Sequence, residues 1–279
     1  MKRNHALLII FAVIELILAS CQKIDDRLYG EVTTMDIPID KPFKSICIYN
    51  NLSVKLKQSH HTRIELTCPS KLADKITYSI NGDTLTLKNE NSLNLNFSTN
   101  YPCELTVYYD ILRSIDFASI GYLKCASPTD SIRGYRPPPT IVDTIVNDSI
   151  AFDTITNPEY FFLQVKEGSG DIDLTFSCNL IKLFFTNGTS KVNFRGRAHY
   201  CEYYLRSYGQ LDARNLRANY VRINNASAND AYVWAAKSEG PVIGLIARIY
   251  SRGNIYYKGH PTITYVHEGQ GRLLPLVED

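Results

Sequence analysis

The chain has 279 residues and a net charge of +2, with 21% of its residues charged, so its charge favours neither nucleic acid nor an acidic partner. Nineteen tyrosines, 15 glycines and few long helical patterns indicate an all-β protein that works outside the cytoplasm. Its length leaves room for one large β domain or two smaller ones.

Residues 1–20 are expected to be an export signal. Lys2 and Arg3 precede an apolar run, Ala6 to Leu18, that is too short to span a bilayer comfortably. The run ends in Leu18-Ala19-Ser20-Cys21, which resembles the lipobox of bacterial lipoprotein precursors. The resemblance implies cleavage before Cys21, lipidation of that cysteine and membrane attachment through the lipid. An ordinary signal peptide with an incidental cysteine is the alternative, and Glu15 within the apolar run departs from the pattern.

Residues 21–42 are interpreted as a tether. Gln22-Lys23-Ile24-Asp25-Asp26 is similar to the short lysine/acidic signal that sends lipoproteins of Bacteroidota to the outer face of the outer membrane. A solvated linker explains the same charges equally well. The segment that continues to Pro42 has no clear period.

Residues 43–125 form a β-rich N-terminal portion in this interpretation. Two alternating runs, Ile76 to Ile80 and Leu85 to Leu87, flank Asn81-Gly82-Asp83, which predicts a hairpin. The run from Leu112 to Phe117 resembles one degenerate coil of the repeat described below. The whole portion is expected to cap one end of that repeat, because an uncovered strand edge promotes aggregation.

Residues 126–160 are interpreted as an insertion. Pro128, Pro137, Pro138 and Pro139 exclude a central strand and indicate an extended loop. The apolar run that begins at Thr140 could form an additional hairpin.

Residues 161–274 repeat. Polar, mostly glycine-bearing breaks recur, and an alternating run follows each break, with equivalent residues at Ile172, Val192, Leu211, Ala231 and Ile255. The steps are 20, 19, 20 and 24 residues, and period-2 alternation within such a repeat predicts a β-solenoid. Each coil of about 20 residues is expected to hold at least two strands and two turns, wound right-handedly.

The repeat also predicts which side chains face the core. The inward columns are Ile172, Val192, Leu211, Ala231, Ile255 and Leu174, Phe194, Ala213, Val233, Tyr257. The outward columns are Asp173, Asn193, Asp212, Tyr232, Tyr256 and Thr175, Arg195, Arg214, Trp234, Lys258. A slip of one residue would bury the polar set, so the register is well specified.

A family resemblance covers residue 43 to about residue 274. It is carried by Phe43-x-x-Ile46, Leu52-x-Val54, Asp83-x-Leu85, Leu112-x-x-Ile115, Gly168-Ser-Gly-Asp and Gly253-Asn-Ile-Tyr-Tyr-Lys-Gly259. This pattern resembles the head GIN domain of putative auto-transporter adhesins. The resemblance implies a β-helix-like fold related in shape to pectin lyases, no established catalytic site, and a role in adhesion. The chain departs from the pattern at Ala226-Ser227-Ala228 and in the insertion.

Three carboxylates on one face of the repeat, Asp171, Asp173 and Asp212, are the candidates for polysaccharide cleavage. Such chemistry needs a paired acid and base, or a metal-held acid cluster, in a cleft. Arg195 and Arg214 occupy the neighbouring column, so ion-paired ladders explain the same residues more simply. We therefore expect no enzyme activity.

An outward aromatic cluster is the preferred candidate for ligand binding. It consists of Tyr232, Trp234 and Tyr256, bordered by Arg214 and Lys258. Aromatic rings with polar neighbours suit sugars, which stack their C–H faces on rings and hydrogen-bond through their hydroxyls. Cross-strand pairing that only stiffens the sheet is the alternative.

The histidines show no metal-ligand spacing, and the cysteines contain no C-x-x-C motif, so neither a metal nor a cofactor is expected. Some cysteines of an exported protein could pair, but the sequence gives no connectivity. The leading hypothesis is a cell-envelope lipoprotein on the outer membrane, with exposure at the cell surface as one of its two possible orientations. Its expected role is adhesion or binding of carbohydrate or another surface polymer. A polysaccharide lyase or hydrolase, and a purely structural envelope protein, are the alternatives.

Overall fold

A computed structural model describes residues 29–91, 103–138, 140–146, 149–155, 157–236 and 243–276, with only the backbone described for 140–146 and 149–155. The fold is all-β, with one short helix among these residues, α2 (Ser70–Ala73). Its strands are β1 (Val32–Pro38), β2 (Ser45–Asn50), β3 (Ser53–Gln58), β4 (Arg63–Pro69), β5 (Ile76–Asn81), β6 (Thr84–Asn89), β7 (Glu104–Tyr109), β8 (Ser114–Ser119), β9 (Leu123–Cys125), β10 (Thr140–Val146), β11 (Ser149–Ile155), β12 (Tyr160–Glu167), β13 (Ile172–Phe185), β14 (Lys191–Leu205), β15 (Gln210–Asn225), β16 (Ala231–Ala235), β17 (Ile243–Ile249), β18 (Ile255–Lys258), β19 (Thr262–His267) and β20 (Leu273–Pro275).

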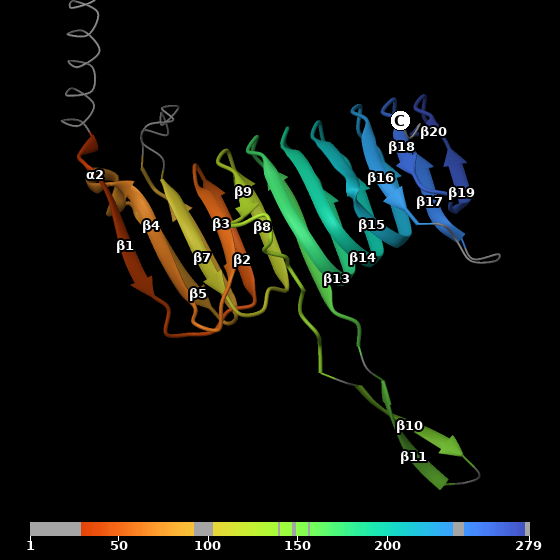
Figure 1. Ribbon diagram of the computed structural model, residues 1–279, viewed down its shortest axis with the longest axis horizontal. Helices are drawn as coiled ribbons and strands as arrows, with labels where there is room; N and C mark the ends of the chain where they lie inside the picture. Colours follow the sequence, from red (N-terminus) through yellow and green to blue (C-terminus); the bar gives the residue numbers. More distant parts are fainter. Residues whose placement is uncertain are drawn as a thin grey trace, which may run out of the picture.

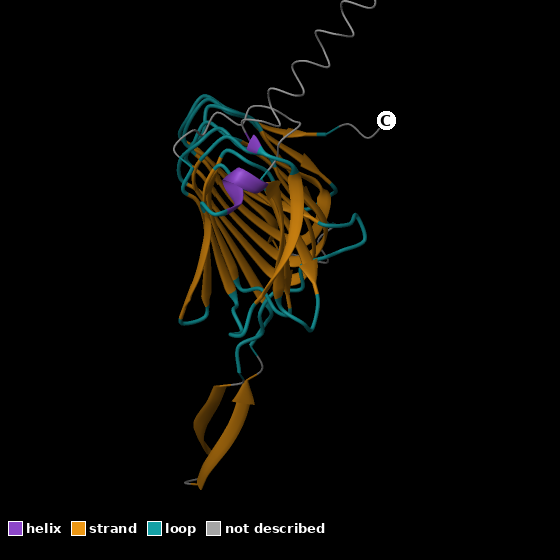
Figure 2. Cartoon of the chain, turned by 90° about the vertical axis from the view of Figure 1, so that its left-hand side faces the viewer, coloured by secondary structure: helices purple, strands orange, loops and turns teal. Residues whose placement is uncertain are grey.

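One large sheet contains every strand except β10 and β11. Its pairings run in two rows. The first row is β1-β4-β7-β3-β9, continued by the first halves of β13, β14 and β15 and then by β16, β18 and β20. The second row is β5-β6-β2-β8-β12, continued by the second halves of β13 to β15 and then by β17 and β19. Because β13, β14 and β15 belong to both rows, the sheet curls into a half-barrel (Figures 1 and 2).

The length of the central strands requires this curl. β13 has 14 residues and would extend about 46 Å if it were straight. The next connection, residues 186–190, can span only about 20 Å. Val192 nevertheless pairs in parallel with Ile172 at the start of β13. The strand must therefore bend until its end lies within one short turn of its beginning.

The expected register is confirmed along the first row. Ile172, Val192, Leu211, Ala231 and Ile255 pair in sequence, and each is fully buried. Their neighbours Leu174, Phe194, Ala213 and Val233 are fully buried as well, whereas Tyr257 is only partly buried against the core. Along the first row, the dry interior of the half-barrel is thus built from residues that recur at intervals of about 20, and the second halves of the central strands add further buried residues such as Ile181 and Leu183.

Three local expectations were wrong. In the repeats that contain β13, β14 and β15, the two expected strands are one continuous curved strand. The tether was expected to lack structure up to Pro42, but β1 pairs antiparallel with β4 within it. A bulge in β15 shifts the pairing, so that Trp234 pairs with Arg217 rather than aligning with Arg214. The right-handed winding stays a prediction.

Glycines occur at the turns for two physical reasons. Gly188 has a φ of 108°, a left-handed conformation that side chains rarely adopt. Gly253, by contrast, is not among the glycines with positive φ. A Cβ on Gly253 would lie 2.1 Å from the carbonyl oxygen of Asn229, in the preceding turn. Close stacking of successive turns, rather than φ alone, therefore selects glycine on this rim.

The N-terminal portion continues the same sheet. β8 pairs in parallel with both β2 and β12, as expected for a degenerate coil. The hairpin expected around Gly82 is present, with Asn81 paired to Thr84. The hairpin expected in the insertion is also present, because β10 pairs antiparallel with β11, and it projects from the sheet (Figure 1).

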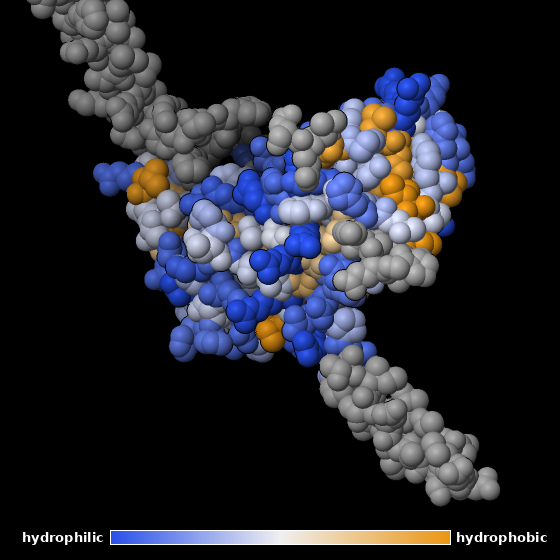
Figure 3. All heavy atoms as spheres, turned by 45° about the vertical axis from the view of Figure 1, so that its right-hand side comes forward, coloured by the Kyte–Doolittle hydropathy of each residue, from blue (hydrophilic) through white to orange (hydrophobic). Residues whose placement is uncertain are grey.

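The two ends of the sheet differ. The N-terminal end is closed by antiparallel strands, with β1 on β4 and β5 on β6. The C-terminal end consists of the parallel strands β19 and β20. Apolar side chains are exposed at this second end, among them Ile243 and Ile263 (Figure 3).

Candidate functional site

The outward aromatic cluster lies on β16 and β18. The backbone register pairs Tyr232 with Tyr256 and Trp234 with Lys258. All four side chains are half-buried on the outer face, while their neighbours Ala231 and Val233 point into the core. Alternation along β16 thus places both aromatic residues of the strand on one exterior surface, which we call the aromatic face.

The two tyrosines of the aromatic face stack in parallel. Their ring centroids are 5.0 Å apart and the rings are tilted by 13°. The guanidinium of Arg214 lies 4.2 Å from the Tyr232 ring centroid, and Arg214 also forms an ion pair of 2.9 Å with Asp212. Both faces of the Tyr232 ring are therefore occupied, and its edge and hydroxyl are the parts that remain for a ligand.

The electrostatics of this cluster follow from its partial burial. Desolvation, together with the charge of Asp230, raises the pKa of the Tyr232 hydroxyl, and Arg214 partly offsets the shift. The hydrogen bond to Asp212 raises the pKa of the Arg214 guanidinium. At neutral pH the site therefore offers a neutral phenol that can donate a hydrogen bond, next to a fixed cation.

Trp234 has cations on its ring from two neighbouring strands. The ammonium of Lys258 lies 4.7 Å from the ring centroid, and the guanidinium of Arg217 lies 6.0 Å from it. All five expected residues therefore lie in this cluster: Tyr256 and Arg214 contact the Tyr232 ring, and Lys258 contacts the Trp234 ring. Arg217 was missed, because only the bulge brings it to the tryptophan.

Two of the three carboxylates considered for catalysis form ion pairs with arginines. Asp173 forms an ion pair of 2.9 Å with Arg195, and Asp212 forms its ion pair with Arg214. Asp171 is exposed, and its backbone carbonyl accepts a hydrogen bond from Leu123. Two of the three carboxylates are thus held in salt bridges, which favours the ladder interpretation over a free acid–base pair.

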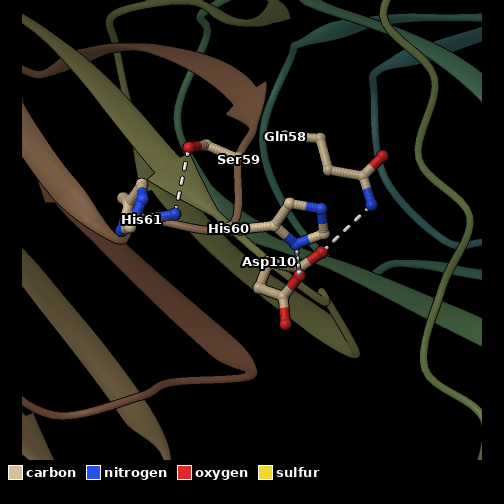
Figure 4. A network of polar contacts seen from close by, with 5 residues as sticks. All are labelled: Gln58, Ser59, His60, His61 and Asp110. Atoms are coloured by element: carbon tan, nitrogen blue, oxygen red, sulfur yellow. Dashed lines mark hydrogen bonds and ion pairs between the residues drawn. The ribbon is translucent and has the colours of Figure 1, made fainter.

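The histidine pair His60-His61 does not converge on a common point. His60 Nδ1 lies 3.3 Å from a carboxylate oxygen of Asp110, whereas His61 points away from this contact (Figure 4). The His60 side chain is 96% exposed, so the contact is a surface one. Among the residues that the structure describes, no group of three or more His, Cys, Asp or Glu side chains could hold a metal ion.

A second outward cluster was not anticipated. Phe162, Phe184 and Tyr204 stack along the second row, with centroid distances of 5.0 and 4.6 Å. Beside them, Glu202 forms ion pairs with Lys182 at 2.8 Å and Arg222 at 3.2 Å. A hollow of about 700 Å³ opens next to these charges. Successive residues in the aromatic stack and in the ion pairs are separated by about 20 residues, the period of the repeat. That spacing could have identified both groups from the sequence.

Cys21 and the rest of residues 1–28 lie outside the described residues, so the lipidation site has no structural description. Within the ranges that the structure does describe, we find no helix long and apolar enough to cross a membrane.

The fold and its surfaces define a repeat-built, all-β protein with aromatic and charged ladders on its exterior. The family model described as "Putative auto-transporter adhesin, head GIN domain" matches residues 42–261. Because this match covers most of the chain, the protein belongs to that family, as the sequence motifs had indicated. A search of curated proteins found no match.

Solved structures share the fold. A putative adhesin from Bacteroides fragilis superposes with a TM-score of 0.64 at 20% identity, covering 88% of this chain and 97% of that one. A putative lipid binding protein from Parabacteroides distasonis has a TM-score of 0.58 at 16% identity, covering 89% and 98%. A putative adhesin from Parabacteroides merdae has a TM-score of 0.51 at 18% identity, covering 89% and 97%. At these low identities the similarity concerns the fold alone, and it carries no information about the ligand.

Proposed function

We propose that this protein is a cell-surface lipoprotein that binds carbohydrate polymer without cleaving it, through the aromatic face. The observation that carries the proposal is the grouping of Tyr232, Trp234 and Tyr256 on two adjacent outward strands, flanked by cations. Ring edges, phenol hydroxyls and charged groups together suit a ligand with both C–H surfaces and hydroxyls. Family membership agrees with a role in adhesion.

The proposed cellular location rests on the sequence. Leu18-Ala19-Ser20-Cys21 would be cleaved and lipidated, and the charged residues after it would direct the protein to the outer membrane surface. The half-barrel would then be held at the membrane by its N-terminal end, with the repeats and the aromatic face extending away. We further propose that the repeats wind right-handedly, the usual sense for parallel crossover connections.

The test is a glycan-array screen with the soluble chain from Gln22 onward. We expect the chain to bind a set of glycans. The bound glycans should keep their full length after prolonged incubation, because the protein does not cleave them. Shortened products would favour the polysaccharide-active alternative. No binding to any glycan would leave the structural envelope protein as the better account.

A further inference from the structure

A cleft runs along the rim where the turns after β14, β15, β17 and β19 stack. We call it the turn cleft. It has a volume of about 600 Å³, and its lining includes Arg206, Tyr208, Ala226, Tyr250, Arg252 and Gln270. An adjoining hollow of about 250 Å³ shares Arg206, Ala226 and Tyr250 and adds Tyr204 and Asn224. Together the two hollows have the volume of an ordinary small-molecule site.

Hydrogen bonds between successive turns hold this cleft in shape. The amide of Gly253 donates to the carbonyl of Ser227 at 3.2 Å, and the amide of Gln270 donates to the carbonyl of Ser251 at 2.8 Å. Asn225 is fully buried beneath the turns, and its side-chain amide donates to the carbonyl of Gly253 at 3.1 Å. A ligand would therefore meet a preorganised backbone and would pay little to order it.

The lining of the turn cleft is basic. Arg206 and Arg252 are exposed, and neither forms an ion pair with any carboxylate in the described part of the chain. No aspartate or glutamate lines either hollow among the described residues. The acidic residue nearest along the chain is Glu268, which is exposed and precedes the lining residue Gly269. Two unopposed guanidinium groups in one concave site favour an anion.

Aromatic and polar groups complete the site. Tyr208 is 71% exposed and Tyr250 is 43% exposed, so both offer ring surface to a ligand. Asn224 lines the adjoining hollow, but its side-chain oxygen is buried and has no hydrogen-bond partner. Because that oxygen is closed off from the hollow, the two exposed rings and the guanidinium groups are the contacts that the site offers to a ligand.

We propose that the turn cleft binds an acidic saccharide whose sugar ring carries a carboxylate. Arg206 and Arg252 would bind the carboxylate, because a guanidinium matches its two oxygens in fork geometry. Tyr208 and Tyr250 would contact the C–H faces of the ring. This inference shares its ligand class with the proposed function but places a second, charge-selective site away from the aromatic face.

The experiment compares a uronic-acid oligosaccharide with its carboxyl-reduced counterpart by titration calorimetry on the folded chain from Gln22 onward. The double variant R206Q/R252Q is expected to weaken binding of the acidic oligosaccharide at least about tenfold. Arg133→Gln, which removes an exposed arginine elsewhere, should leave that affinity within about twofold. Carboxyl reduction of the ligand should weaken binding to the wild-type chain by a similar factor.

Each contrary result has a separate meaning. Equal affinity for the acidic and reduced ligands, or unchanged affinity in R206Q/R252Q, would overturn the acidic-saccharide site. Loss of acidic-ligand binding in Trp234→Ala alone would move the ligand to the aromatic face, leaving the proposed function intact and this inference wrong. Displacement by inorganic sulfate at matched ionic strength would show a general anion site, which also contradicts the proposal.

A different observation carries a second inference, at the N-terminal end. Cys68 is a buried residue near the end of β4, and Cys103 immediately precedes β7. The antiparallel register pairs Thr67 with Glu104, so the next residues along, Cys68 and Cys103, face each other. Their sulfur atoms lie 2.8 Å apart and both residues are buried. The shared hydrogen bond raises the pKa of the Cys68 thiol and lowers that of Cys103.

We infer that Cys68 and Cys103 form a disulfide once the chain has left the cytoplasm. This inference rests on the proposed export of the protein to the cell envelope. The oxidant would be the disulfide of an envelope thiol oxidoreductase. The Cys103 thiolate attacks one sulfur of that disulfide and releases the other as a thiolate. Cys68 then loses its proton and attacks the Cys103 sulfur, which releases the second oxidoreductase thiolate. One disulfide is thereby transferred, and the oxidoreductase is reduced to its dithiol.

The test refolds the chain in a glutathione redox buffer, traps free thiols by alkylation and maps peptides without reduction. The expected product is a cross-linked pair of peptides that contain Cys68 and Cys103, two hydrogen masses lighter than the separate thiols. Reduction should lower the melting temperature of the wild type but not that of Cys68→Ser. Alkylation of both cysteines in correctly refolded protein, or a dominant cross-link to Cys178 or Cys201, would contradict the inference.

Discussion

At the scale of single residues, Phe194 shows how the core is held together. It is fully buried, and its ring packs edge-on against Phe176 with centroids 4.9 Å apart. Its neighbour Asn193 lies on the same strand but on the outward side, between Asp173 and Asp212 in the sheet. Two adjacent residues therefore have opposite environments, which makes them a sensitive pair for testing the register.

We expect Phe194→Ala to lower the free energy of unfolding by ~3–5 kcal/mol, because it leaves a cavity in a rigid core. Asn193→Ala should cost less than ~0.5 kcal/mol, as surface substitutions usually do. Denaturant melts of both variants measure these differences. Equal losses, or the reverse order, would show that the register is misassigned.

Gly253 tests why glycine is needed on the rim. A methyl group there would collide with the rigid backbone of the preceding turn, so Gly253→Ala should cost about 3 kcal/mol, the upper range for overpacking. Gly82 provides the contrast, because its φ is 60° but open space surrounds it. Gly82→Ala should cost about 1 kcal/mol, from backbone strain alone. Thermal melts in which Gly82→Ala is the more damaging change would refute the stacking explanation.

At the scale of strands, charged ladders cross the outer surface. Glu202 on β14 connects Lys182 on β13 to Arg222 on β15, and it accepts a hydrogen bond from the Tyr204 hydroxyl at 3.1 Å. Burial tends to raise the pKa of the Glu202 carboxyl, but Lys182, Tyr204 and Arg222 together outweigh this and lower it. The carboxylate is thus stabilised in its charged form by residues from three consecutive strands.

This lowered pKa predicts a pH dependence. A carboxyl group whose folded pKa is lowered contributes stability above its unfolded pKa, near 4.5, and loses that contribution as the pH falls through the folded value. Glu202→Gln should therefore cost about 1–2 kcal/mol at neutral pH, and the cost should shrink below about pH 4. Glu167→Gln, at an exposed position, should be nearly neutral throughout. Urea melts across this pH range give the comparison, and a cost that grows on acidification would contradict it.

The sequence predicts the strand register well, because side-chain alternation is a local signal that repeats. Ile172, Val192 and Leu211 each satisfy the same pattern, so errors at one position are corrected by the others. It predicts irregularities poorly. The bulge that brings Arg217 rather than Arg214 into line with Trp234 depends on how β15 fits between β14 and β16, which no single strand encodes. The turn cleft was missed for a similar reason, because its lining comes from four separate turns.

At the scale of the whole molecule, the curled sheet is an elongated body with unlike ends. Antiparallel strands close the end formed by the N-terminal portion, whereas parallel strands with exposed apolar residues form the other end. This polarity is compatible with the proposed lipid attachment, in which the C-terminal repeats would point away from the membrane. The aromatic face and the turn cleft both lie in those C-terminal repeats.

The anchor is tested by Cys21→Ala. Lipidation needs the thiol of that cysteine, so the variant should leave the membrane fraction and appear with the soluble proteins. The measurement is the partition of the full-length chain between the two fractions, with Cys47→Ala as the matched control. If Cys21→Ala stays in the membrane as the wild type does, another anchor must be present.

Binding of glycan at the aromatic face is tested by one affinity measurement. A neutral glycan identified on the array is titrated into the wild-type chain, Trp234→Ala and Tyr122→Ala. Tyr122 is also half-buried and lies 4.1 Å from the ammonium of Lys124, but it sits in the N-terminal portion. We expect Trp234→Ala to weaken binding by ~1–3 kcal/mol at a nearly unchanged melting temperature, as truncation of a binding hot spot does. Tyr122→Ala should bind like the wild type. Unchanged affinity in Trp234→Ala, or an equal loss in both variants, would contradict it.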